Sequence, residues 1–309
     1  KHQGAPPEKH QGAQPEKQKV VLAVGGKTTL YYLPLTLADR LGYFADEGLD
    51  VEINDFPGGS RALQALIGHS ADVVSGAYEH TIVMQTLAQK VQAFVLQGMN
   101  PGLELGIRKD RAADYTWAKD LKGMKIGVSA PGSSTHMLVN HLLASVGLKQ
   151  DDVSIIGVGT GPTAVAAMRS GQVDALSSVE PVMTLLERSG DIRIVVETIT
   201  EKGVREVFGG SMPAATLYAR ADFIEQNPHT VQALTNAIVR ALLWLQAYAD
   251  WPGAALAFAL SLAMFGAAFT EWCGIHAIFG AVLIGVAIGD SPHMREKIRA
   301  NVEQFVSFI

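Results

Sequence analysis

The 309-residue chain contains a single cysteine, Cys273, and little charge of either sign. One thiol can form neither an internal disulfide nor a thiolate cage for zinc. Charged residues make up 18% of the chain and the formal net charge is −5, so the composition offers no basic surface for nucleic acid. The patterns H-E-x-x-H, G-x-S-x-G, G-x-G-x-x-G and the Walker loop are also missing. The sequence therefore predicts no catalytic residue, no metal site, no cofactor and no nucleic-acid partner.

The chain begins with a tandem octapeptide, KHQGAPPE followed by KHQGAQPE, over residues 1–16. This stretch is polar and carries proline and glutamine, so it cannot bury a core. We expect residues 1–19 to form a disordered tail.

Apolar residues make up 48% of the chain, and short β-prone runs alternate with helix-like segments from Lys19 to about Asp250. This alternation is typical of an α/β fold in which parallel sheets are covered by helices on both faces. The expected strands are 20–24, 51–53, 73–76, 93–97, 103–107, 125–128, 153–158, 175–178 and 192–196. The expected helices are 34–47, 60–68, 79–89, 133–146, 162–170, 180–189 and 221–249.

The two halves of this region repeat one another. A shift of 102 positions places Ala62, Ala65, Asp72 and Ser75 on Ala164, Ala167, Asp174 and Ser177. A repeat of this length is the size of a domain, so it indicates a duplicated lobe. We expect the chain to cross between the lobes near residues 107–110 and 209–213. Lobe I would then contain residues 20–107 and 213–250, and lobe II residues 108–212.

Three turns rich in glycine and hydroxyl residues join a predicted strand to a predicted helix, at residues 25–29, 57–60 and 130–135. Backbone N–H groups at such helix starts bind anions and polar groups, although N-capping alone explains any single turn. Ligands of open parallel sheets bind beyond the carboxyl ends of the strands. The three turns therefore predict one solvent-filled cleft between the lobes.

Four separated segments carry a family likeness: VVLAVGGKTTLYYLPLTLADRLGYFADEGLDVEI, ADVVSGAYEH, DLKGMKIGVSAPGSSTHMLVNHLLASVGL and MRSGQVDALSSVEP. They resemble the sulfonate/nitrate/taurine-type substrate-binding proteins of ABC importers over residues 20 to about 248. The resemblance implies a two-lobed periplasmic binding fold of type II that closes on a small organic solute. It also implies ABC permease and ATPase subunits as partners, and a periplasmic location with the signal peptide already removed.

By position, the resemblance places a ligand shell on both lobes. Its lobe I members are Tyr31, Tyr32, Ser60, Tyr78, Glu79 and His80, and its lobe II members are Ser133, Ser134, Thr135, Thr160 and Glu180. Glu79 and Glu180 both follow predicted strands, whereas Lys27 is the only cation in the three turns. We therefore expect a ligand with both a hydrogen-bond-donating nitrogen group and an acceptor or anionic group.

The expected function is capture of a small organic solute (a sulfonate, a carboxylate or a nitrogen heterocycle) without catalysis. One alternative is a thiamine-pyrimidine-precursor enzyme of the same fold. The resemblance implies a cysteine-rich motif for that branch, and this sequence lacks it. A second alternative is a membrane-tethered sensory binding module, which depends on the C-terminal part of the chain.

Residues 251–309 have a foreign character. Between Trp251 and Gly289 the only formally charged residue is Glu271, and the two flanking stretches approach the length of a membrane span. The stretch from Thr270 to Ile309 resembles a membrane segment of sodium/proton antiporters. The simplest interpretation is a chimera of two unrelated coding regions. The alternatives are a pair of apolar helices of a soluble protein and membrane association through residues 252–289. We expect residues 256–288 to form helices that pack poorly against the lobes.

Overall fold

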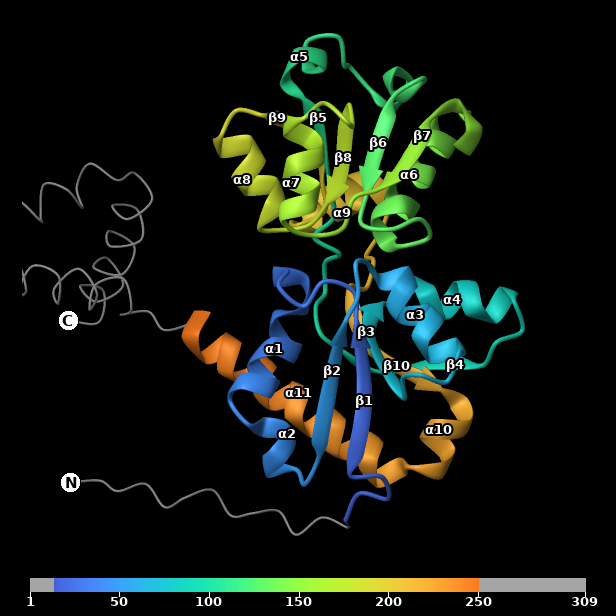
Figure 1. Cartoon of the computed structure of the whole chain (residues 1–309), viewed down its shortest axis with the longest axis vertical. Helices are drawn as coiled ribbons and strands as arrows, with labels where there is room; N and C mark the ends of the chain where they lie inside the picture. The colour runs from blue at the N-terminus through green and yellow to red at the C-terminus, as the bar shows by residue number, and fades with distance from the viewer. Residues whose placement is uncertain (1–13, 250–309) are drawn as a thin grey trace, which may run out of the picture. The chain divides into compact units, whose positions relative to one another are not determined.

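The computed structural model describes residues 14–249, and the structural statements below refer to that part of the chain. Its strands form two separate five-stranded sheets (Figure 1). Residues 20–24 and 125–128 lie in different sheets, as the prediction of two lobes requires. The predictions for residues 1–13 and 250–309 lie outside the described residues.

The first sheet has the strand order β2-β1-β3-β10-β4. In this order the strands are Asp50–Asp55, Lys19–Val24, Val73–Ala77, Ala215–Arg220 and Val91–Leu96. The strand β1 pairs in parallel with β2 and β3, whereas β10 runs antiparallel to both β3 and β4.

The second sheet has the order β7-β6-β8-β5-β9. Its strands are Ser154–Gly157, Lys125–Val128, Ala175–Ser178, Glu104–Arg108 and Ile192–Glu197. Here β6 pairs in parallel with β7 and β8, and β5 runs antiparallel to β8 and β9. The two sheets therefore share one topology, and the duplication read from the sequence extends to the strand order.

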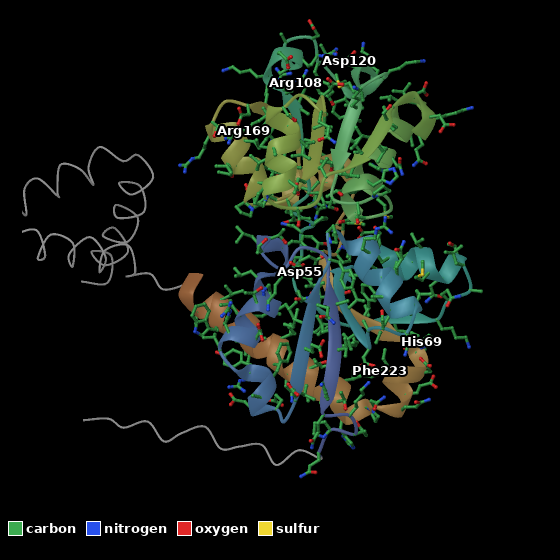
Figure 2. All side chains as sticks on the ribbon, viewed as in Figure 1. Asp55, His69, Arg108, Asp120, Arg169 and Phe223 are labelled. Atoms are coloured by element: carbon green, nitrogen blue, oxygen red, sulfur yellow. The ribbon has the colours of Figure 1, made fainter. Side chains whose placement is uncertain are left out.

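The prediction of parallel sheets is wrong for the fourth strand of each sheet. The strands β1, β3, β6 and β8 end at the junction between the lobes, where the chain also crosses. A chain that has just crossed starts its next strand at the junction, so β5 and β10 run away from it and are antiparallel to their neighbours. In Figure 2, Arg108 at the end of β5 accordingly lies at the far end of the second lobe.

The same geometry places the first crossing earlier than the sequence predicts. Residues 103–107 are expected in lobe I, but Glu104–Arg108 pairs with β8 and β9 in the second sheet. The first crossing therefore lies at residues 97–103, between β4 and β5. The return lies between α9, which ends at Phe208, and β10, which begins at Ala215.

Helices cover both faces of each sheet. The first lobe contains η1 (Leu30–Tyr32), α1 (Leu33–Arg40), α2 (Tyr43–Asp46), α3 (Gly59–Ile67), α4 (Glu79–Thr86), α10 (Ala221–Gln226) and α11 (Pro228–Ala249). The second contains α5 (Lys109–Ala112), η2 (Ala118–Leu121), α6 (Ser134–Ser145), η3 (Gln150–Asp152), α7 (Pro162–Arg169), α8 (Val182–Arg188) and α9 (Glu201–Phe208).

Two long predicted helices are each divided in the structure. Residues 34–47 form α1 and α2, because Gly42 adopts φ +74°, a left-handed conformation that a helix cannot continue. Residues 221–249 form α10 and α11, because the ring of Pro228 lacks the N–H that would continue the first helix. The sequence pattern also misses α9 and β10. The apolar stripe of α9 is short, because its only apolar side chains are Val204, which is buried, and Val207 and Phe208, which pack on the core of the second lobe.

The core of each lobe lies on both faces of its sheet. On one face of the first sheet Leu22 packs with Leu35 and Ile238, and on the other Ala23 packs with Leu63 and Leu66. Adjacent residues of β1 enter opposite cores because successive side chains of a strand point to opposite faces. The second sheet likewise has one cluster around Leu105 and Ile126 and another around Met168 and Leu176.

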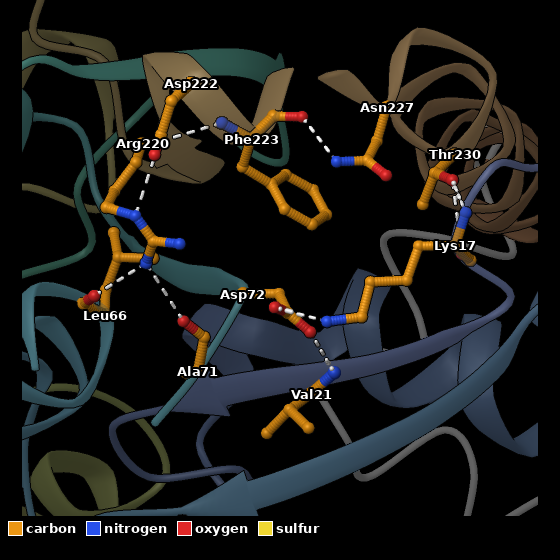
Figure 3. Close-up of polar contacts among 10 residues, drawn as sticks. All are labelled: Lys17, Val21, Leu66, Ala71, Asp72, Arg220, Asp222, Phe223, Asn227 and Thr230. Carbon is orange, nitrogen blue, oxygen red and sulfur yellow. Dashed lines mark hydrogen bonds and ion pairs between the residues drawn. The ribbon is translucent and has the colours of Figure 1, made fainter. Parts of the chain in front are cut away.

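The predicted tail is shorter than expected, because its last residues are tied to the first lobe. The Glu16 carboxylate accepts hydrogen bonds from His229 N at 3.1 Å and Thr230 N at 2.9 Å, which caps α11. The Lys17 ammonium lies 2.7 Å from the Asp72 carboxylate (Figure 3), and β1 begins at Lys19. Within residues 14–249, no helix combines the length and apolar composition needed to cross a membrane.

Candidate functional site

The two lobes touch through the serines of two predicted turns. Ser60, in the first turn of α3, and Ser133, which precedes α6, are both buried. The Ser133 hydroxyl donates to Ser60 Oγ at 3.1 Å and accepts from Ser60 N at 3.0 Å. The Ser60 hydroxyl donates to Pro131 O at 2.8 Å. The turns at 57–60 and 130–135 therefore face each other as predicted, but at this point they are in contact rather than separated by solvent.

Glycines make this close approach possible. A Cβ at Gly58 would lie 2.8 Å from the Cβ of Ala130 and 3.0 Å from Ser133 Oγ, in the other lobe. A Cβ at Gly26 would lie 2.5 Å from Thr160 Oγ1, so Thr160 is also at the junction. A further backbone hydrogen bond joins Leu30 N to Glu180 O at 3.1 Å.

The turn at 25–29 is already filled by a carboxylate of the protein. Gly26 N and Lys27 N both donate to Asp55 Oδ1 at 2.9 Å, and Asp55 ends β2 near the junction (Figure 2). The Lys27 ammonium lies 2.8 Å from the Asp39 carboxylate. The N–H groups of Gly26 and Lys27 thus hold an anionic group that belongs to the protein itself, and that this turn binds a solute stays a prediction. The position of Asp55 at the carboxyl end of a neighbouring strand was a signal available in the sequence.

In the second lobe, two predicted ligand residues have their side chains bound to their own turn or helix. Thr135 Oγ1 accepts from Ser129 N at 3.0 Å and also bonds to Ser129 Oγ at 2.9 Å. The Glu180 carboxylate accepts from Thr184 N at 3.0 Å and from the Thr184 hydroxyl, so it stabilises the start of α8. Ser134 is half-buried and makes no side-chain hydrogen bond within the described part of the chain.

The other predicted residues of lobe I form a buried cluster near the start of α4. Tyr31 and Tyr32 pack edge to face with ring centroids 4.9 Å apart, and a Cβ at Gly59 would lie 3.0 Å from His80 and 3.7 Å from Tyr32 Oη. Tyr31 also contacts the apolar cores of both lobes. Tyr78 is only half-buried, and its backbone N–H donates to Ala214 O at 3.2 Å.

Glu79 is the acidic member of this cluster and is only 6% exposed. Burial raises the pKa of its carboxyl from 4.5 to about 7, although its own backbone N–H lowers the pKa in part. Burial and then the nearby Glu79 charge raise the pKa of both Tyr31 and Tyr32. The pKa of Tyr218 is also raised, first by burial, then by the nearby Tyr32 and then by the Glu79 charge.

His80 lies beside Glu79 and is held neutral. Its Nδ1 is 3.2 Å from the Tyr218 hydroxyl, and its Nε2 is buried with no hydrogen-bond partner among the described residues. Burial lowers the pKa of His80 to about 4, although the backbone of Gly132, from the second lobe, acts in the opposite direction. The second lobe therefore comes close to this cluster at His80.

The predicted site omitted several buried polar groups at the junction ends of the strands. The Gln97 amide donates to Ser75 Oγ at 2.9 Å, while Gln97 Oε1 has no partner among the described residues. Of the buried hydroxyls without a partner in this part of the chain, those of Thr216, Ser177 and Ser178 lie at the junction, whereas Tyr115 follows α5 at the far end of the second lobe. Glu104 Oε2 is also buried without a hydrogen-bond partner among the described residues. Burial, and then the negative charges of Glu180, Glu187 and Glu197, raise the pKa of the Glu104 carboxyl to about 8. Polar groups that are buried without partners are costly, so we take this end of both sheets as the candidate binding region.

The arrangement has no metal-binding character. Within residues 14–249, no three His, Cys, Asp or Glu side chains are grouped so that they could hold an ion. What the junction offers is hydrogen-bonding groups from both lobes, two buried carboxyls and tyrosine rings.

Comparison with known proteins agrees with this geometry. The profile of the NMT1-like family matches residues 13–258. The chain belongs to the NMT1-like family. A Bordetella bronchiseptica protein of solved structure is 59% identical, with a TM-score of 0.74 over 75% of this chain and 73% of that one. The alkanesulfonate-binding protein SsuA from Xanthomonas axonopodis, bound to MOPS, is 20% identical, with a TM-score of 0.58 over 73% of each chain. The fold of this NMT1-like protein is thus the type II periplasmic binding fold, as predicted.

Most relatives of this NMT1-like chain are described as binding proteins. YtlA of Bacillus subtilis is 25% identical over 221 residues, which are 71% of this chain and 64% of that protein. The nitrate/nitrite binding protein NrtA of Nostoc is 27% identical over 235 residues, 68% of this chain and 50% of that one. A thiamine-pyrimidine enzyme, 4-amino-5-hydroxymethyl-2-methylpyrimidine phosphate synthase of Schizosaccharomyces pombe, is 27% identical over 234 residues. The chain spans about half to two thirds of the length of these curated relatives.

The end of the chain is similar to a different family. The profile of the sodium/hydrogen exchanger transmembrane family matches residues 234–309 and overlaps the NMT1-like match over 234–258. This confirms the resemblance to antiporters, and places its beginning earlier than residue 251.

Proposed function

We propose that this protein is the solute-binding component of an ABC importer, that it works in the periplasm, and that it has no catalytic activity. The observation that carries the proposal is the junction itself. Two lobes of one topology meet at glycine and serine turns, beside buried polar groups that have no partner in the described chain. Such groups at the mouth of two facing sheets are suited to a small polar solute enclosed by both lobes.

Closure of the lobes would couple binding to transport. The contact between Ser60 and Ser133 joins the lobes directly, so a solute that bonds to both lobes adds to an interaction that already favours closure. A ligand shifts such an equilibrium only by its difference in affinity for the two states. A permease and its ATPase would then recognise the closed form.

Relatives of known type support this function. NrtA is described as binding nitrate and nitrite, and SsuA as binding alkanesulfonates. The similarity to the fission-yeast synthase favours an enzyme as second candidate. Against it, the chain has one cysteine, so it lacks the cysteine-rich motif that the sequence resemblance associates with the enzyme branch.

A thermal-shift screen of the full chain against sulfonates, carboxylates, nitrate, amines and pyrimidines tests the proposal. A solute at 100 times its Kd adds about 2.7 kcal/mol of stability, which a melting curve resolves. One solute should bind per protein chain. The radius of gyration from X-ray scattering should decrease or stay the same when the protein is saturated with solute. Turnover of a bound pyrimidine precursor would instead support the enzyme, and absence of any binder across the classes would contradict solute capture.

A further inference from the structure

The buried carboxyl of Glu79 has no charge partner. It is 6% exposed and opens α4, and within residues 14–249 it makes no ion pair and no hydrogen bond to another residue. A helix start favours an acid through the helix dipole, but such acids are normally solvated. Burying a carboxylate without a partner is costly, so either a proton or a donor from outside the chain must compensate it.

The side chains around Glu79 are neutral. Tyr31, Tyr32 and Tyr218 are close enough for its charge to raise their pKa, and His80 is neutral, with Nδ1 3.2 Å from the Tyr218 hydroxyl. Asp55, which acts on Tyr32, adds a second negative charge on this side. The two carboxylates that act on these tyrosines, Glu79 and Asp55, are thus both acidic groups near the cluster.

The predicted anion-binding turn at residues 25–29 offers no compensation. The ammonium of Lys27 is paired with Asp39, and the N–H groups of Gly26 and Lys27 are bonded to Asp55. A nitrate or sulfonate entering here would face Glu79 and Asp55 without a free cation from this turn. A cation would instead gain a charge-assisted hydrogen bond to Glu79 beside tyrosine rings, which attract cations through their faces.

We propose that the solute carries a cationic nitrogen group, an amine or an amidine, and that the Glu79 carboxylate binds it. The inference rests on the proposed solute-binding function and assigns the substrate class. A cationic solute would differ in charge from the solutes of the relatives that are described as binding nitrate or alkanesulfonate.

The test uses compounds of matched shape and opposite charge on the full chain. The pairs are n-butylamine with butanesulfonate, and benzamidine with benzoate, measured by calorimetry at pH 6 and pH 8. Both cations stay protonated at these pH values, so a change in their affinity reports the protein. We expect each cation that binds to do so at least tenfold more tightly than its matched anion at pH 8. It should bind roughly tenfold more weakly at pH 6, where a carboxyl with a pKa of about 7 is mostly protonated.

Variants identify the group responsible. Glu79→Gln should weaken cation binding at least tenfold and abolish its pH dependence, and Glu79→Asp should recover part of both. Glu201→Gln, which removes an exposed acid paired with Arg205 on α9, is the matched control and should change neither.

Two failures are distinguishable. Tighter binding of the anion of either pair, or cation binding that ignores both pH and Glu79→Gln, overturns the substrate class and leaves solute capture standing. Absence of binding by compounds of either charge, together with no binder in the wider thermal-shift screen, removes the proposed function and this inference together.

Discussion

Asp72 and Asp174 occupy equivalent positions in the two sheets and make the same contacts. Asp72 N donates to Val21 O at 2.8 Å, and the Asp72 carboxylate accepts from Val21 N at 3.0 Å (Figure 3). Asp174 N donates to Lys125 O at 2.7 Å, and its carboxylate accepts from Lys125 N at 3.0 Å. Each aspartate thus ties the loop before one strand (β3 or β8) to the strand that lies beside it (β1 or β6).

We predict that Asp72→Ala and Asp174→Ala each lower the free energy of unfolding by about 1–3 kcal/mol, because each leaves a strand N–H without its charged acceptor. The two aspartates lie in different sheets, so the double variant should lose the sum within about 0.5 kcal/mol. Urea denaturation measures all three. The control is Asp151→Ala, which removes an exposed acid whose side chain makes no hydrogen bond or ion pair among the described residues. If the double variant is as stable as the less stable single variant, the two aspartates do not contribute independently, and their structural equivalence is only apparent.

Ser133→Ala should weaken solute binding and leave the fold intact. The variant loses the bonds from Ser133 Oγ to Ser60 Oγ and Ser60 N, worth about 0.5–1.5 kcal/mol each. The Kd should rise by roughly 5- to 100-fold, because the closed state becomes less favourable. Ser145→Ala, on the exposed end of the same helix, also loses a hydrogen bond and serves as the control. Equal effects of the two changes on Kd would argue against a closing role.

Gly58→Ala should open the junction sterically. Its new Cβ would lie 2.8 Å from the Ala130 Cβ, in the other lobe, so the strain is relieved when the lobes separate. We expect a larger radius of gyration by X-ray scattering and a Kd raised at least tenfold. Adding Ala130→Gly removes the opposing methyl and should restore part of the affinity. An unchanged radius with lost thermal stability would mean that the clash is absorbed inside one lobe.

The stability of the free protein should depend on pH through Glu79. Its pKa rises from 4.5 in the unfolded chain to about 7 in the fold, so between these values the folded state binds more protons. The free energy of unfolding therefore falls as pH rises through this window. Glu79→Gln removes the penalty, and its stability advantage should grow by about 1.4 kcal/mol per pH unit and level off above pH 7.

Urea titrations of both proteins from pH 4.5 to 8 measure this difference. The pKa of His80 is lowered from 6.5 to about 4, so it opposes folding as the pH falls through that range. Because His80 is present in both proteins, its contribution largely cancels. If the difference in free energy of unfolding between the two proteins stays constant with pH, Glu79 does not have a raised pKa in the folded protein.

A chain ending at Ala249 should bind the same solutes as the full chain. Residues 14–249 contain both sheets and all the junction contacts described above. Ligand-induced shifts in Tm should therefore agree between the two within error. Loss of binding in the shorter chain, with a soluble monomeric full chain, would make residues 250–309 part of the fold and defeat the chimera interpretation.

Local sequence by itself determined most strands, the helices that follow them and the duplication. The runs 125–128 and 175–178 are strands with the predicted bounds. In the first of them Ile126 and Val128 are β-branched residues that favour a strand. The placement of Tyr31, Tyr32, Glu79 and His80 in one ligand shell came from the family resemblance and not from a local pattern.

Only the tertiary structure decided which sheet each crossing strand joins and which polar groups remain free. Residues 104–108 read equally well as a strand of either lobe, and only their pairing with β8 and β9 assigns them. Likewise, Glu180 and Glu79 look alike in sequence, but Thr184 binds one carboxylate and nothing in the described chain binds the other. Pairing and burial depend on residues distant in sequence, so no local pattern carries that information.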